Sequence, residues 1–195
     1  GNWNLDGDAY YGEYSGDMVS GGIDRFWEVI VGRIPYYGTI ADLDNILQKT
    51  MDYQNQPIGS VAWRRNALLP MKDPDATTLI YRLGEQIKND TLVPAGWSYH
   101  RVYDLAYSLT PPPETMPCNM TNVTNVWKGG SFGLVVWSTH GTATEAVSVM
   151  NTSYAAQLSD NFPAMAFQCS CNNAYPETTG NLCYTLLKKG VVSAV

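Results

Sequence analysis

The sequence predicts an α/β fold with a mainly parallel sheet and helices on both faces. Short apolar runs, typical of buried strands, alternate along the chain with amphipathic segments of helical spacing. The chain has 195 residues, of which 45% are hydrophobic and 15% are charged, so it can bury the core of one such domain. We therefore expect one globular domain rather than two.

The N-terminal part combines an irregular segment with one strand. Residues 1–22 are rich in Gly, Asp and Tyr, which predicts irregular structure, so we expect the folded domain to cover 23–195. The apolar run 26–31 predicts a buried strand, and the turn formers Gly32 and Pro35 close it.

Helices and strands alternate through the middle of the chain. Apolar residues at helical spacing predict a helix over 40–54, where Thr39 with Asp42 resembles a capping pair. The elements expected next are a strand within 63–70, an amphipathic helix over 79–87 and a short strand over 99–103.

The same alternation continues to the end of the chain. Gly129 and Gly130 separate a short helix from the strand that follows it. The expected elements are a helix over 121–128, strands over 132–139 and 163–168, a helix over 182–189 and a last strand over 191–195.

Two of these strands end at reactive side chains. His140, one of only two histidines, follows the strand 132–139, and Cys169 and Cys171 follow the strand 163–168. The carboxyl ends of parallel strands meet at one edge of a sheet, and a thiol needs a nearby imidazole to take or balance its proton at neutral pH. The pattern predicts a Cys/His nucleophilic site. The alternative is a strand-end histidine with core or disulfide-bonded cysteines.

Composition excludes several other functions. The net charge is -6 and no Lys/Arg cluster breaks that trend, which argues against a nucleic acid partner. No apolar stretch approaches the length of ~20 residues that spans a bilayer, and no signal peptide opens the chain. Because the chain opens directly in a polar segment, we expect a mature or recombinant fragment from which any export signal has been removed. Its 4 cysteines are too few for a disulfide-built scaffold.

The N-terminal segment also contains a calcium-like pattern. Oxygen-donor side chains follow the spacing of an EF-hand-like loop, with a glycine at the bend and a final carboxylate. These residues are Asn2, Asn4, Asp6, Gly7, Asp8 and Glu13. They predict a structural calcium site, and the alternative is a cluster of polar turns.

Taken in order, the motifs resemble the gingipain-type cysteine peptidases, which share the caspase-like fold. The resemblance runs from about Asp6 to Val195. Its motifs are Gly-Arg-Ile-Pro at 32–35, Asp-Leu-Asp-Asn at 42–45, His-Gly-Thr-Ala-Thr at 140–144, the run 163–171 and Cys-Tyr-Thr-Leu-Leu at 183–187. It implies a caspase-like α/β/α domain, truncated at both ends, in a secreted, periplasmic or cell-surface protein that acts on proteins or peptides.

The resemblance also implies roles for single residues. The dyad would be His140 with Cys171, because the family nucleophile follows a small residue, as Cys171 follows Ser170. The backbone N–H groups of Gly141 and Cys171 would form the oxyanion hole. Cys169 would point to the opposite face or lie within the strand, and could pack or form a disulfide, for example with Cys183.

Two acidic residues complete the site that the resemblance implies. Asp73 would orient the histidine, and Asp75 would line a pocket for a basic side chain, which favours cleavage after Arg or Lys. Asp75 is also a candidate helix N-cap. Thr139 and Ala174 stand where the family usually has Gly, which leaves open a non-catalytic, calcium-stabilised binding or assembly module on the same scaffold.

Overall fold

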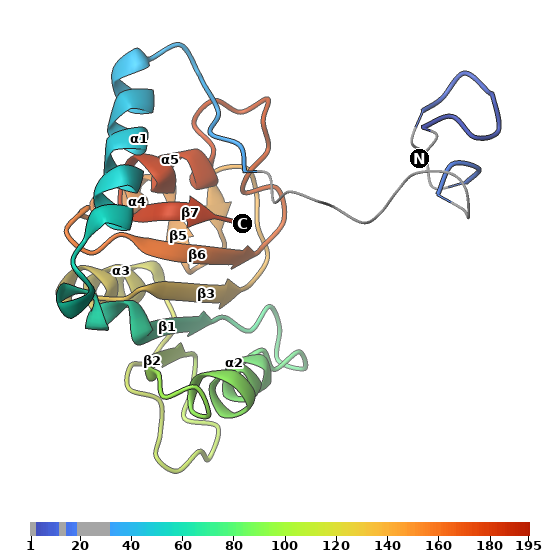
Figure 1. The fold of residues 1–195 in the computed structure, drawn as a ribbon. Helices are drawn as coiled ribbons and strands as arrows, with labels where there is room; N and C mark the ends of the chain where they lie inside the picture. Colours follow the sequence, from blue (N-terminus) through green and yellow to red (C-terminus); the bar gives the residue numbers. More distant parts are fainter. Residues whose placement is uncertain (1–2, 12–14, 19–31) are drawn as a thin grey trace. The chain divides into compact units, whose positions relative to one another are not determined.

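The computed structural model describes residues 3–11, 15–18 and 32–195. The chain divides into two compact units, Gly1–Ile34 and Pro35–Val195. The boundary expected after residue 22 lies outside the described residues and stays a prediction. Every helix and strand described below belongs to the second unit (Figure 1). The strand expected over 26–31 lies outside the described residues.

A parallel sheet forms the centre of the second unit. In the part of the chain that the structure describes, this sheet has five strands in the order β2-β1-β3-β6-β7, and all neighbouring pairs are parallel (Figure 1). The strands are β1 (Asn66–Met71), β2 (Ser98–Tyr103), β3 (Leu134–Ser138), β6 (Ala164–Cys169) and β7 (Val191–Ala194). The predicted α/β class and parallel sheet are therefore confirmed.

Helices pack on both faces of this sheet, as predicted. The larger core contains residues from α1 (Ile40–Asn55), α3 (Met120–Gly129), α4 (Thr152–Ala155) and α5 (Leu182–Lys188). The smaller core contains residues from α2 (Tyr81–Ile87) and from the π-helical turn η3 (Lys88–Leu92). Side chains alternate along a strand, so Leu68 faces the larger core while Ala67 and Leu69 face the smaller one.

Several short elements were not predicted. A two-stranded antiparallel hairpin joins β4 (Glu145–Ala146) to β5 (Met150–Asn151), and α4 follows it directly. The 3-10 helices η1 (Ile58–Ser60) and η2 (Ala62–Arg65) lead into β1. Elements this short contain too few residues to produce a periodic pattern, so the sequence gives no signal for them.

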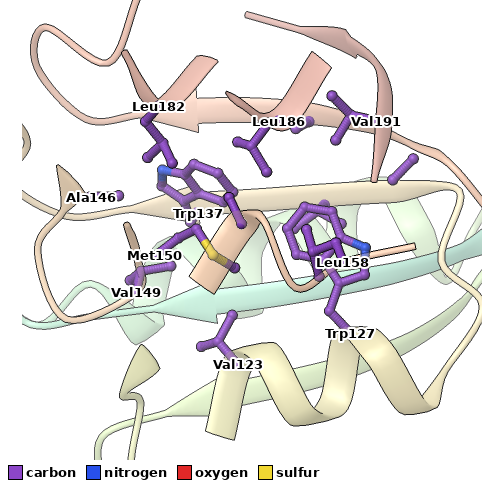
Figure 2. Packing of buried hydrophobic residues seen from close by; sticks show 14 of the residues in the cluster. Val123, Trp127, Trp137, Ala146, Val149, Met150, Leu158, Leu182, Leu186 and Val191 are labelled. Atoms are coloured by element: carbon purple, nitrogen blue, oxygen red, sulfur yellow. The ribbon is translucent and has the colours of Figure 1, made fainter. Parts of the chain in front are cut away.

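Trp137 of β3 lies at the centre of the larger core. Figure 2 shows its indole with Leu182 and Leu186 on one side and Met150 on the other. The Trp127 ring meets it edge to face, with 6.5 Å between the ring centroids. Removing a fully buried aromatic side chain costs about 3–5 kcal/mol of unfolding free energy, so Trp137 fixes the position of β3 in the sheet.

The second face of the sheet is covered unevenly. Leu134 and Val136 of β3 pack in the smaller core, where α2 lies. Their neighbours on β6 in the parallel register are Met165 and Phe167, whose side chains are 48% and 51% exposed. The apolar face therefore continues from β3 onto β6, where the described residues leave it open.

The predicted capping pair at the start of α1 is wrong. Thr39 occupies the N-cap position but makes no side-chain capping hydrogen bond. Asp42 instead accepts a hydrogen bond from Tyr184 Oη at 3.4 Å and pairs with Lys188 Nζ at 3.6 Å. Its carboxylate is thus used to hold α1 against α5.

In the described residues, no helix combines the length and the hydropathy that crossing a membrane requires.

Arg101 of β2 is a buried cation with two acidic partners. Its guanidinium pairs with Glu85 at 3.1 Å and with Glu114 at 2.7 Å, and its side chain is 1% exposed. Burial alone would raise the pKa of each glutamate, but hydrogen bonds from Arg101, and also from Lys88 to Glu85, outweigh burial and lower it. The network ties α2 and the loop before α3 to β2.

Replacing Arg101 with Met should lower the free energy of unfolding by about 1.5–3 kcal/mol at pH 7, because it removes the charged hydrogen bonds that the partly exposed Glu85 and Glu114 receive. The lowered pKa values mean that this stabilisation is present above the unfolded glutamate pKa of ~4.3 and is lost as the pH falls through the folded value. Urea unfolding should therefore show the full difference from the wild type at pH 7, a slightly smaller one at pH 4, and a difference that shrinks further as the pH falls through the lowered folded pKa of Glu85 and Glu114.

Arg82→Met is the matched control, since Arg82 is an exposed residue of α2. It should change stability by no more than about 0.5 kcal/mol. Equal losses from the two substitutions would contradict the assignment.

Candidate active site

The register of β3 and β6 brings His140 and Cys171 to the same edge of the sheet. Ser138 pairs with Cys169 at the ends of these two parallel strands. His140 stands two residues after Ser138, and Cys171 stands two residues after Cys169. Both strands therefore deliver their reactive residue at the same level, and both side chains are exposed there.

His140 and Cys171 line a common cavity of about 380 Å³. The loop after β1 and the start of α2 supply one wall, and the ends of β3 and β6 supply the other. The lining residues are Pro74, Ile80, Ser138, Thr139, His140, Cys169, Ser170 and Cys171. An imidazole and a thiol that share one open cavity can act together on a carbonyl group that enters it.

Gly141 packs its backbone against that of Cys171. A Cβ atom at position 141 would lie 2.4 Å from the carbonyl oxygen and 2.8 Å from the nitrogen of Cys171. Any side chain there would force the two loops apart, so the close approach requires glycine. This contact directly joins the turn that carries the histidine to the turn that carries the cysteine.

The backbone N–H groups near the thiol are available to a ligand. Hydrogen bonds from Val147 N to His140 O and from Thr142 N to Glu145 O, both 2.8 Å, fix the turn around Gly141. Within the described ranges, no hydrogen bond from the Gly141 or Cys171 N–H group is found. Two such donors side by side can stabilise negative charge on an oxygen atom.

Asn173 holds the two loops together and was not identified from the sequence. Its side chain is 3% exposed, and its Nδ2 donates to the carbonyl oxygens of Thr142 at 2.6 Å and Glu145 at 3.0 Å. Its Oδ1 accepts a hydrogen bond from Ser170 Oγ, which in turn accepts one from Trp137 Nε1 at 2.9 Å. The only signal in the sequence is the position of Asn173 two residues after Cys171.

Asp73 has partners other than the histidine. Its Oδ1 accepts a hydrogen bond from the Ile80 N–H group at 2.6 Å, and its Oδ2 accepts one from Tyr107 Oη. Burial, followed by this hydrogen bond, raises the pKa of Tyr107. Among the described residues, no hydrogen bond or ion pair joins Asp73 to His140, although Pro74, the residue after Asp73, lines the same cavity as His140.

Asp75 closes a local turn. Its carboxylate accepts hydrogen bonds from the backbone N–H groups of Thr77 at 2.7 Å and Thr78 at 2.8 Å, and from both threonine hydroxyls. These hydrogen bonds hold the pKa of Asp75 well below its usual value. The N-cap position of α2 belongs to Ile80, so the capping alternative for Asp75 is wrong. Asp75 is also not among the residues that line the cavity.

The predicted calcium ligands are described only in part. Asn2 and Glu13 lie outside the described residues. Asn4 Nδ2 donates to the Asp8 carbonyl oxygen at 2.9 Å, while Asp6 Oδ1 accepts from Asp8 N and Asp8 Oδ1 from Tyr10 N. In the described part of the chain, no group of three or more His, Cys, Asp or Glu side chains could hold a metal ion. Calcium binding there stays a prediction.

The cysteines are all free, so the alternative of a disulfide between Cys169 and Cys183 is wrong. Cys169 follows Phe167 on the open face of β6, whereas Cys183 belongs to α5, which packs on the opposite face, so the sheet separates the two thiols. Burial raises the pKa of Cys118 and of Cys183. Cys169 and Cys171 are the exposed thiols.

Comparisons with known proteins show the family and the fold of this chain. The profile of peptidase family C25 matches residues 3–192. Among solved structures, the chain is similar to the Arg-specific cysteine proteinase gingipain R (RGPB), with a TM-score of 0.63 and 18% identity over 80% of this chain and 37% of that chain. It is also similar to the complex of Porphyromonas gingivalis RgpB pro- and mature domains, with a TM-score of 0.63 and 16% identity over 81% of this chain and 38% of that chain.

The similarity confirms the predicted gingipain-like, caspase-like fold. The chain spans less than two fifths of the length of these two structures. A search of curated protein sequences finds no match.

Brief treatment of the native chain with iodoacetamide at pH 7.5 should modify Cys169 and Cys171, modify Cys183 slowly and leave Cys118 unmodified, because alkylation requires an accessible thiolate. Peptide mapping by mass spectrometry gives the extent at each position. Unfolding in urea should make all four cysteines equally reactive. Protection of Cys171 in the native chain would contradict the site.

Replacing Asn173 with Ala should lower the free energy of unfolding by about 2 kcal/mol, because it removes a buried side chain that satisfies two carbonyl oxygens. Chemical unfolding measures this loss. The matched control is Asn172→Gly, since Asn172 is exposed and has a φ of 61°, which glycine tolerates. A control that loses as much stability as Asn173→Ala would show that the buried amide is not the reason.

Proposed function

Because the chain belongs to peptidase family C25, we propose that it is a cysteine endopeptidase with Cys171 as nucleophile and His140 as general acid and base. The observation that carries the proposal is the cavity that His140 and Cys171 line together at the ends of paired strands. The substrates would be proteins or peptides, since the reaction that this family performs is hydrolysis of the peptide bond.

The proposed reaction has two halves. His140 takes the thiol proton as the Cys171 sulfur attacks the carbonyl carbon, and the C–N bond breaks as His140 gives that proton to the leaving amine. Water then attacks the thioester while His140 removes its proton, the C–S bond breaks to release the carboxylic acid, and His140 returns the proton to the sulfur. The N–H groups of Gly141 and Cys171 would stabilise the oxyanion, and each such donor can contribute ~3 kcal/mol to the transition state.

Position favours Cys171 over Cys169 as the nucleophile. Cys169 is the last residue of β6 and pairs with Ser138 within the sheet. Cys171 lies in the turn beyond the strand, where its own backbone nitrogen contacts Gly141. A tetrahedral intermediate on Cys171 would therefore lie close to both candidate donors, the N–H group of Cys171 itself and that of Gly141 in the adjacent turn.

A non-catalytic binding or assembly module is the second candidate. It is favoured by the His140 ring, for which no hydrogen bond to an orienting carboxylate is found in the described residues, and by Thr139 and Ala174, which replace the usual glycines. In this case the chain would keep the caspase-like fold but would not hydrolyse peptide bonds. Structural calcium and a secreted, periplasmic or cell-surface location remain parts of the proposal that rest on resemblance. Cleavage after Arg or Lys is what the resemblance alone implies, and Asp75, the residue expected to select a basic side chain, does not line the cavity.

Cys171→Ala should abolish cleavage of a mixed peptide pool, whereas Cys169→Ala should retain at least about half of the wild-type rate. His140→Ala should reduce the rate by at least about 100-fold, since a positioned acid-base group contributes 10²–10⁴-fold. Cleavage is followed by mass spectrometry of the products, and circular dichroism checks that each variant is folded. An inert wild-type chain would favour the non-catalytic module, and loss of activity in Cys169→Ala alone would reassign the nucleophile.

A further inference from the structure

The cavity beside the thiol carries an inference about substrate class, which rests on the proposed function. We propose that this cavity receives an apolar side chain from the residue whose carbonyl Cys171 attacks, so that cleavage follows residues such as Leu or Met rather than Arg or Lys. The side chain of that residue is the one closest to the reacting carbonyl, and the cavity contains the thiol itself.

The walls of the cavity fit an apolar group. Pro74 and Ile80 form the side that faces the ends of β3 and β6. The remaining lining residues are serine, threonine and cysteine side chains, together with His140. Its volume of about 380 Å³ lies within the ~300–1,000 Å³ range of small-ligand pockets and accommodates a side chain of this size.

No carboxylate in the cavity would balance a basic side chain. Among the described residues, the lining set contains neither Asp nor Glu. The nearest acids along the chain, Asp73 and Asp75, accept hydrogen bonds from Ile80 N and Tyr107 Oη, and from Thr77 and Thr78, respectively. Burying a guanidinium or ammonium group without a partner is costly, so a charged side chain would bind poorly.

The surroundings of the cavity extend its apolar character. Ile80 also packs in the smaller core, which covers Leu134 and Val136 of β3. On β6, Phe167 precedes Cys169 by two residues and therefore lies on the same face of the sheet as this lining residue. Phe167 is 51% exposed, so an apolar surface leads along β6 to the cavity.

The test uses the full chain and a set of peptides that differ only at the residue before the scissile bond. The values of kcat/KM for Leu and Met should exceed those for Arg and Lys by at least about 10-fold, within the range that an apolar pocket contributes. Asp75→Asn should leave this order unchanged. Ile80→Glu should raise the relative rate for Arg, whereas Leu83→Glu, an exposed residue of α2 outside the cavity, should not.

The outcomes separate this inference from the proposed function. A wild-type preference for Arg or Lys that disappears in Asp75→Asn would overturn the apolar pocket and leave the peptidase intact. A chain that cleaves no peptide of the set, and whose Cys171 reacts with neither a Leu-terminated nor an Arg-terminated peptidyl ketone probe, would overturn both. If Ile80→Glu does not fold, the comparison of the wild type with Asp75→Asn decides the question without it.

Discussion

The parallel pairing of β3 with β6 is the constraint on which the site depends. Main-chain hydrogen bonds fix Ser138 opposite Cys169, and each strand then needs the same number of residues to reach its reactive side chain. A shift of one residue in this register would move Cys171 along the strand and turn the β6 side chains to the other face. Trp137, fully buried on β3, resists such a shift because moving β3 would expose its indole or push it into side chains that already fill the core (Figure 2).

A second layer of contacts converts this register into a defined arrangement of loops. The indole N–H of Trp137 reaches Ser170, which bonds to Asn173, and the amide of Asn173 reaches the carbonyl oxygens of the turn after His140. This chain of hydrogen bonds therefore begins at Trp137, a residue of the hydrophobic core, and ends at the loop that follows His140. Buried networks of this kind hold a unique geometry because breaking one bond leaves an unsatisfied group.

The sequence was sufficient for the parallel sheet and for placing His140 and Cys171 after neighbouring strands, since buried strands and their polar exits produce local patterns. It failed where position depends on partners that are distant along the chain. Thr39 had the residue type of a cap without its hydrogen bond, and Asp73 bonds to Ile80 and Tyr107. Asn173 could not be predicted as a bridge, because an asparagine in a polar turn gives no sign of its burial.

At the contact between Gly141 and Cys171, one residue is constrained by packing and the other by chemistry. The thiol of Cys171 projects from an exposed turn, so its exchange for another small residue would disturb chemistry without disturbing packing. Position 141 has no such freedom, because its missing side chain is what lets two backbones touch. If the chain is the peptidase proposed above, a relative without activity could carry another small residue at 171 but would still need glycine at 141, so the two positions together would distinguish a retained activity from a retained fold.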